Sequence, residues 1–394
     1  MKILIADKFP EQYLKQFYEL GLETVYSPKL TEDELPEAVQ DADILVVRST
    51  IVSAKTIKSA SNLNLIVRAG AGVNNIDIPA ANQKGIYVAN CPGKNSIAVA
   101  ELAIGLMISL DRRIAGNVID FKRGVWNKAE YSKAEGLFGK TLALIGVGNI
   151  GKEVAKRALA LGMNVYGKDI SRIEGVGIKD FSEMDQILPI ADVISIHLPL
   201  TSETRNLFDD KIFGYVKPNA ILINTSRAEI IDEQALINAV KTKNLKVGLD
   251  VFKDEPEGKD GSVSSKLQEL DNVYITHHIG ASTEQAQNAV AEETIRIIKD
   301  YLCSGVIAHW VNRAQRTLAS YQLIVKHYDK PGVLAAIFDI LREDNINIEE
   351  VENVIFEGGI AASCTMRISK PATSEMLKVI RDNPEVLSVS HLAI

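Results

Sequence analysis

The sequence has little cysteine, and the cysteine it has is scattered. Cys91, Cys303 and Cys364 lie far apart along 394 residues and show no spacing typical of a metal site. This excludes a disulfide framework and a cysteine-based metal centre, and the sequence predicts no metal site. Free thiols of this kind are typical of the reducing cytoplasm, which is the location we expect.

Long apolar runs and an excess of basic residues are also lacking. No stretch stays apolar for the roughly 20 residues that a membrane-spanning helix needs. The first residues indicate a β-strand rather than a secretory leader. With 44 Lys and Arg against 51 Asp and Glu, the net charge is −7, which argues against a general nucleic-acid surface. We therefore expect neither a membrane nor a nucleic-acid partner.

What is present is a regular alternation of apolar strands and helical stretches, with a length that fits two or three domains. Such alternation predicts parallel sheets with helices on both faces. We expect an α/β protein with two doubly wound, Rossmann-like parallel sheets. The first domain is predicted to be discontinuous, residues 1–95 and 283–312, and the second to cover residues 96–282.

Residues 141–169 carry the most informative motif. An apolar strand, residues 141–145, leads into the sequence GVGNIG and then into a helical stretch. The glycines permit a tight turn, close approach of a pyrophosphate and close helix packing, and the helix N-terminus offers free N–H groups to the phosphates. Asp169 follows at the distance where an acid binds the adenosine ribose. This pattern predicts NAD as the cofactor rather than NADP, because a carboxylate repels a 2′-phosphate.

Polar clusters follow the later strands, and three of them contain candidate catalytic residues: Arg227, Glu255 and His278. Strand ends in a parallel sheet share one edge, where ligands bind. A histidine can take a hydroxyl proton at neutral pH, a carboxylate can orient its ring, and an arginine can bind a substrate carboxylate. Each residue alone is more often a surface residue, and His277 competes with His278, so only the joint pattern supports catalysis.

The last stretch, residues 321–394, has the order β-α-β-β-α-β. That order predicts a ferredoxin-like domain. It contains no convincing catalytic cluster, so we expect it to serve in regulation or assembly.

The motifs GVGNIG, Asp169, NTSRA, DVFKDEP and HHIGAST, together with RST, RAGAGVNNID and NCPGKNS nearer the N-terminus, resemble those of the D-isomer-specific 2-hydroxyacid dehydrogenases. The resemblance covers nearly the whole chain and implies NAD-dependent oxidation of 3-phosphoglycerate to 3-phosphohydroxypyruvate, the first step of serine synthesis. It also implies that residues 321–394 form an ACT-like regulatory domain, with L-serine as its effector, and that the protein is a homodimer or homotetramer.

The resemblance assigns catalysis to Arg227, Glu255 and His278. It implies a cofactor site made of ten residues: Gly146, Gly148, Asn149, Ile150, Gly151, Asp169, Pro199, Thr204, Thr225 and Asp250. The substrate would be bound by six residues: Arg48, Ser49, Arg68, Gly72, Val73 and Asn95. Lys94 and Lys128 are further candidates for neutralising its phosphate.

Three positions depart from the family pattern. Ala228 replaces the usual glycine after the catalytic arginine, and is tolerated only if its φ is negative. His277 replaces the usual proline before the catalytic histidine. Asp329 replaces an asparagine that serine-inhibited relatives tend to have, which leaves serine inhibition open.

Two other functions stay open. One is a different D-2-hydroxyacid dehydrogenase, such as a glyoxylate or hydroxypyruvate reductase. The other is an NAD-sensing scaffold without catalysis, which the presence of Arg227, Glu255 and His278 argues against. Assays of both acids separate the first pair of functions, and a His278→Ala variant separates an enzyme from a scaffold.

Overall fold

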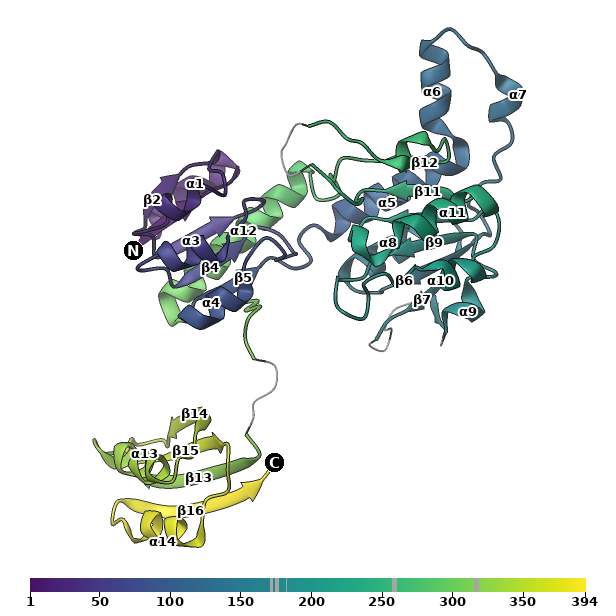
Figure 1. Cartoon of the computed structure of the whole chain (residues 1–394). Helices are drawn as coiled ribbons and strands as arrows, with labels where there is room; N and C mark the ends of the chain where they lie inside the picture. Colours follow the sequence, from purple (N-terminus) through teal and green to yellow (C-terminus); the bar gives the residue numbers. More distant parts are fainter. Residues whose placement is uncertain (171–172, 174–176, 182, 257–260, 315–318) are drawn as a thin grey trace. The chain divides into compact units, whose positions relative to one another are not determined.

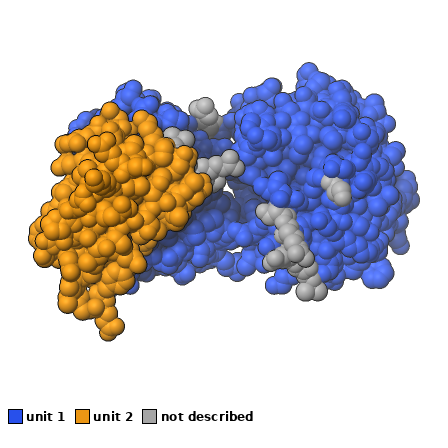
Figure 2. Space-filling view, turned by 90° about the horizontal axis from the view of Figure 1, so that it is seen from below, with its two compact units in different colours: residues 1–312 blue, residues 313–394 orange. Residues whose placement is uncertain are grey.

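A computed structural model describes residues 1–170, 173, 177–181, 183–256, 261–314 and 319–394. The chain divides into two compact units, residues 1–312 and 313–394, shown in different colours in Figure 2. Among the described residues no helix combines the length and apolarity needed to cross a bilayer.

The first sheet of residues 1–312 has five parallel strands in the order β2-β1-β3-β4-β5. Four of its strands are largely buried and apolar, as expected for a parallel sheet covered on both faces, whereas no residue of the edge strand β2 is buried. The elements of this region are β1 (Lys2–Ile5), α1 (Glu11–Glu19), β2 (Glu23–Tyr26), α2 (Leu35–Ala38), β3 (Ile44–Val47), α3 (Ala54–Ser59), β4 (Leu65–Arg68), α4 (Ile78–Lys84) and β5 (Tyr87–Asn90).

The helix α12 (Glu284–Ser304) packs on this first sheet although it is nearly 200 positions further along the chain (Figure 1). Its buried residues Ala291, Ile295 and Ile298 share a core with the strands. Tyr13 of α1 donates a hydrogen bond to Glu292 of α12, 2.8 Å away. Residues near both ends of the 1–312 unit therefore contribute to the core on this sheet. The domain boundaries given above stay a prediction.

The second sheet has seven strands in the order β12-β11-β10-β9-β6-β7-β8, and all its described pairings are parallel. The order reverses between β6 and β9, which is the position where doubly wound sheets bind ligands. Its elements are β6 (Thr141–Ile145), α8 (Asn149–Ala160), β7 (Asn164–Lys168), β8 (Ile178–Asp180), α9 (Met184–Ile187), β9 (Val193–Ile196), α10 (Asp210–Tyr215), β10 (Ile221–Asn224), η1 (Ala228–Ile230), α11 (Glu233–Lys243), β11 (Lys246–Leu249), η2 (Lys266–Glu269) and β12 (Val273–Ile275).

Three helices precede the second sheet: α5 (Ser96–Arg112), α6 (Ile114–Lys122) and α7 (Lys128–Tyr131). The long helix α5 buries one face, with Val99, Ala103 and Leu106 among its buried residues. The structure buries none of the residues of α6. Figure 1 shows residues 114–131, which contain α6, α7 and the loop between them, as an arm beyond the second sheet.

Residues 313–394 form a four-stranded antiparallel sheet, order β14-β15-β13-β16, with its own apolar core. Its elements in chain order are β13 (Tyr321–Tyr328), α13 (Val333–Glu343), β14 (Ile348–Ile355), β15 (Ala361–Ile368), α14 (Ser374–Asp382) and β16 (Val386–Ala393). This β-α-β-β-α-β order confirms the ferredoxin-like prediction, and the two parallel sheets confirm the α/β prediction.

Candidate active site

The glycine turn after β6 has the geometry that a dinucleotide site needs. Gly146 has a φ of +94°, and a Cβ there would lie 2.5 Å from the carbonyl oxygen of His197. A Cβ on Gly151 would lie 2.3 Å from the carbonyl oxygen of Gly146. Gly148 faces open space and directly precedes α8. Two glycines thus permit tight packing, while the third leaves the helix N-terminus accessible to a phosphate.

Asp169 lies at the end of β7, beside this turn. Its carboxylate accepts a hydrogen bond of 2.7 Å from the N–H of Val147. The acid is therefore fixed next to the glycine turn, where the ribose of a dinucleotide is expected. These residues fit NAD by their own geometry.

Other predicted cofactor residues gather at neighbouring strand ends. Thr204 donates a hydrogen bond to the carbonyl of Pro199, 2.7 Å away. The hydroxyl of Thr225 is buried without a partner among the described residues, which suits a ligand that supplies one. Ile150, in the first turn of α8, packs against the core beneath the sheet.

Asp250 has a second task that the sequence did not indicate. It is 2% exposed, and its two oxygens accept hydrogen bonds from the N–H groups of Ile279 and Gly280 and from the Thr276 hydroxyl. The carboxylate thus ties the end of β11 to the loop that carries His278.

Two of the three candidate catalytic residues make direct contact. His278 Nδ1 lies 2.8 Å from Glu255 Oε2, although 23 residues separate them in sequence. The other Glu255 oxygen accepts the Phe252 N–H at 3.0 Å. The hydrogen bond to Glu255 raises the pKa of His278, while burial and the charge of Arg227 oppose this effect. With Nδ1 engaged, Nε2 is the ring nitrogen that can exchange a proton with a ligand.

The residues around this pair bear on two of the departures from the family pattern. Ala228 starts the 3₁₀ helix η1 and is absent from the residues with positive φ, so its side chain is tolerated. The contact with Glu255 is made by His278 and not by His277. The backbone of His278 has a φ of +50°.

Arg227 lies beside the loop that follows β4. A Cβ on Gly72 would be 2.2 Å from Arg227 Nη2, so a larger residue at position 72 would displace this guanidinium. Asn224 also supports Arg227, because its side-chain amide donates a hydrogen bond to the Arg227 carbonyl at 2.9 Å. The structure therefore brings Arg227 next to the predicted substrate loop, which includes Gly72 and Val73.

Arg48 and Arg68 add two more guanidiniums. Burial, followed by the charges of Arg227 and Arg48, lowers the pKa of Arg68 to about 10. The Nε of Arg68 is buried without a partner, and neither Arg48 nor Arg68 makes an ion pair among the described residues. The charges of Arg48 and Arg227 therefore act on Arg68, and a region with three guanidiniums of this kind is favourable for a ligand with several negative charges.

The remaining candidates for substrate binding are Ser49, Asn95 and Lys94, and their polar groups differ in the partners they have. The N–H of Ser49 donates to Asp7, 2.9 Å away, and the side-chain oxygen of Asn95 is buried and unpartnered. Lys94 instead makes an ion pair of 3.1 Å with Glu293, a residue of α12 that is 4% exposed. Lys94 is thus directed to a protein carboxylate rather than left free for a phosphate.

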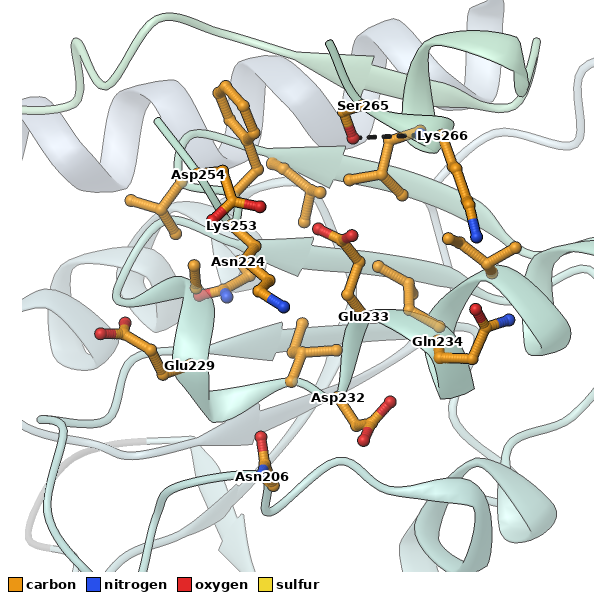
Figure 3. Close-up of a pocket in the computed structure, with 18 of the residues that line it drawn as sticks. Asn206, Asn224, Glu229, Asp232, Glu233, Gln234, Lys253, Asp254, Ser265 and Lys266 are labelled. Atoms are coloured by element: carbon orange, nitrogen blue, oxygen red, sulfur yellow. Dashed lines mark hydrogen bonds between the residues drawn. The ribbon is translucent and has the colours of Figure 1, made fainter. Parts of the chain in front are cut away.

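A pocket of about 600 Å³ lies in the second-sheet region, lined by residues between Arg205 and Leu267, and Figure 3 shows it in close-up. Its lining includes Ala228 and Asp254, the chain neighbours of Arg227 and Glu255, and the Glu233 carboxylate lies near its middle. Arg227, Glu255 and His278 do not line it. The pocket therefore adjoins the candidate catalytic centre without being part of it.

Sequence reasoning missed Asp7 and His197. Both follow strands of the parallel sheets, so the rule that selected Arg227 and His278 applied to them as well. His197 is 9% exposed, its Nε2 is 2.8 Å from the Ser195 hydroxyl, and burial lowers its pKa to about 4. It is neutral at physiological pH.

Comparison with known proteins gives a consistent result. Residues 104–280 match the family of D-isomer specific 2-hydroxyacid dehydrogenase, NAD binding domain. The chain is 42% identical over 317 residues to D-3-phosphoglycerate dehydrogenase of Methanocaldococcus jannaschii, covering 78% of this chain and 59% of that protein. It is 43% identical over 294 residues to hydroxypyruvate reductase of Thermotoga maritima, covering 74% and 94%.

A solved structure agrees with these sequences. The NAD⁺-bound 3-phosphoglycerate dehydrogenase of Entamoeba histolytica superimposes with a TM-score of 0.66 at 31% identity. The match covers 79% of this chain and 99% of that one. The chain spans less than two thirds of the length of the Methanocaldococcus relative. The family match confirms the NAD-binding domain that the glycine turn predicted.

Proposed function

The chain belongs to the D-isomer-specific 2-hydroxyacid dehydrogenases, and we propose that it oxidises 3-phospho-D-glycerate to 3-phosphohydroxypyruvate with NAD, the first step of L-serine biosynthesis. The observation that carries the choice of substrate is the group of Arg48, Arg68 and Arg227 without ion-pair partners among the described residues. A substrate with a carboxylate and a phosphate supplies the negative charges that these cations favour.

The roles of the catalytic residues follow from their contacts. NAD bound at the glycine turn would supply the hydride acceptor for this oxidation. His278 takes the hydroxyl proton at Nε2, because its Nδ1 is held by Glu255. Glu255 stabilises the imidazolium that results. Arg227 binds the substrate carboxylate, together with N–H groups of the loop that contains Gly72 and Val73.

Hydroxypyruvate reduction is the second candidate, because the Thermotoga relative carries that name and is covered over 94% of its length. The two functions differ in whether the substrate carries a phosphate. The deciding experiment measures NADH formation with 3-phosphoglycerate and with D-glycerate, and NADH consumption with hydroxypyruvate. Turnover of D-glycerate without turnover of 3-phosphoglycerate would overturn the proposal.

A His278→Ala variant separates an enzyme from an NAD-sensing scaffold. Loss of the general base is expected to lower kcat by about 10²–10⁴-fold, with NAD binding kept. Retention of full NADH formation would remove His278 from the mechanism.

We propose further that two copies associate through the arm formed by α6 and α7. Its apolar side chains are unusually open to solvent: Val118 is 48%, Phe121 68% and Trp126 79% exposed. Exposed apolar groups in this number favour an interface, here in a homodimer or homotetramer. Sedimentation of a Phe121→Ser/Trp126→Ser variant is expected to show a smaller particle than the unmodified chain.

The ferredoxin-like unit is proposed to be regulatory, with L-serine as its effector. Its β-α-β-β-α-β order of elements supports this proposal, and so does Asn347, which matches the pattern of serine-inhibited relatives. The three free cysteines support a cytoplasmic location.

A further inference from the structure

Asp7 occupies an unusual position at the carboxyl edge of the first sheet. One of its oxygens, Oδ2, accepts hydrogen bonds from three successive backbone N–H groups: Arg48 at 2.7 Å, Ser49 at 2.9 Å and Thr50 at 3.0 Å. Asp7 is 8% exposed. Successive N–H groups that converge in this way form a concave anion site. Here the anion is a carboxylate of the protein itself.

The sheet topology explains why these groups meet. β1 pairs with β3 in parallel, with Ile5 opposite Val46, so the residues beyond both strands leave the sheet side by side. The strand order β2-β1-β3 places them at the point where the order of the sheet reverses. Doubly wound sheets bind their ligands at this point.

The turn that Asp7 binds is also held from the other side. The side-chain amide of Asn75 donates to the carbonyl of Thr50 at 2.8 Å, and the N–H of Val52 donates to the Asn75 carbonyl at 2.7 Å. The backbone of residues 48–50 is thus fixed twice. By contrast, the Arg48 guanidinium has no hydrogen bond or ion pair among the described residues. The base of this side chain is fixed while its charged end stays available to a ligand.

We propose that Asp7 is a positioning residue for recognition of the anionic end of the substrate. Its carboxylate fills the backbone anion site, so that a phosphate binds to the side chains of Arg48 and Ser49 and not to the three N–H groups. Asp7 itself does not touch the substrate. This inference rests on the proposed function, because it concerns the phosphate of 3-phosphoglycerate.

The test compares Asp7→Asn with a matched control, Asp43→Asn. Asp43 lies at the other end of β3, and its carboxylate also accepts a backbone N–H, that of Lys2 at 2.6 Å. Asp7→Asn keeps the shape of the side chain but removes its charge. We expect its KM for 3-phosphoglycerate to rise about tenfold, with kcat and the KM for D-glycerate changed by less than about twofold. Asp43→Asn is expected to leave all three constants unchanged.

A second variant tests the anion site directly. In Asp7→Ala the three N–H groups lose their acceptor, so the KM for 3-phosphoglycerate is expected to rise. Added acetate is expected to lower the KM of this variant towards that of the unmodified chain measured in the same acetate. A merely structural role of Asp7 would give equal losses for both acids and no effect of acetate. Either result, or an unchanged KM in Asp7→Asn, overturns the inference.

The unmodified chain is measured first, which separates this inference from the proposed function. If it does not turn over 3-phosphoglycerate, the proposed function fails at that step and the role of Asp7 fails with it. If it does, the variants alone decide the role of Asp7.

Discussion

At the scale of single residues, the contact between Glu255 and His278 determines how activity depends on pH. The hydrogen bond that His278 donates to Glu255 raises the pKa of His278. A base must be neutral to accept a proton, so oxidation is expected to increase as the pH rises through that raised pKa. Removal of the carboxylate charge removes the main cause of the shift.

In Glu255→Gln we therefore expect the rising limb of kcat/KM against pH to move to lower pH. The plateau should fall about 10–100-fold, because the imidazolium loses its partner. The measurement is kcat/KM for 3-phosphoglycerate between about pH 5.5 and 9.5. Glu269→Gln, which changes an exposed acid of η2, serves as the control. A limb that stays in place or moves upward would contradict the assigned roles.

Asp169 offers a second test at this scale. Asp169→Asn keeps an oxygen that can accept the Val147 N–H, now bonded at 2.7 Å, but loses the charge that repels a 2′-phosphate. We expect the KM for NAD to rise and the preference for NAD over NADP to fall about tenfold. Steady-state kinetics with both cofactors measure this change. An unchanged ratio of the two specificities would remove Asp169 from cofactor selection.

At the scale of elements, α12 links the segment after β5 to the segment that precedes the second unit. Glu293 of this helix contacts Lys94, Arg296 and His309, and the hydrogen bond from Arg296 is the main cause that lowers the pKa of Glu293 to about 2, with burial opposing it. Lys94 precedes α5, and His309 follows α12. One carboxylate thus joins three stretches of chain.

Glu293→Gln is expected to lower the free energy of unfolding at pH 7 by about 1–3 kcal/mol, the range for hydrogen bonds to charged groups. Because the folded pKa is below the unfolded value, the stabilisation is present above the unfolded pKa of about 4.3 and is lost as the pH falls towards 2. Urea unfolding at pH 7 and at pH 3 measures both values.

The control for this prediction is Glu19→Gln, which breaks the exposed ion pair between Lys15 and Glu19 in α1. Its effect should be below about 0.5 kcal/mol. Equal effects of the two substitutions, or a Glu293→Gln effect that does not shrink at pH 3, would be evidence against the network.

At the scale of the whole molecule, residues 1–312 and 313–394 have separate cores. The antiparallel sheet of the second unit pairs only with its own strands among the described residues. Each unit therefore contains the apolar contacts that its own folding requires.

A chain shortened to residues 1–312 is expected to fold, to bind NAD and to keep kcat for 3-phosphoglycerate within about threefold. Any inhibition by L-serine seen in the full chain should be lost. Circular dichroism, NADH formation and the particle mass in solution measure these properties. A shortened chain that folds but still responds to serine would place the effector site outside the ferredoxin-like unit.

The sequence by itself determined the alternation of strands and helices, the glycine turn and the β-α-β-β-α-β order of the last unit. These features depend on residues within about ten positions of one another, as in the run from Thr141 to Gly151, so local patterns of polarity and backbone freedom are sufficient to predict them. It also placed Arg227 and His278 at strand ends, because every strand of a parallel sheet ends at the same edge.

Only the tertiary structure decided which of those residues touch. These contacts join residues that are far apart in the sequence. Glu255 and His278 are 23 positions apart, and the ion pair of Lys94 with Glu293 spans 199 positions. Asp7 accepts hydrogen bonds from three N–H groups that lie about 40 positions further along the chain. Sheet order and the packing of α12 bring them together, and neither follows from local pattern. The physical reason is that a hydrogen bond or ion pair depends on ångström-scale distances, whereas a polarity pattern fixes only the face or edge on which a residue lies.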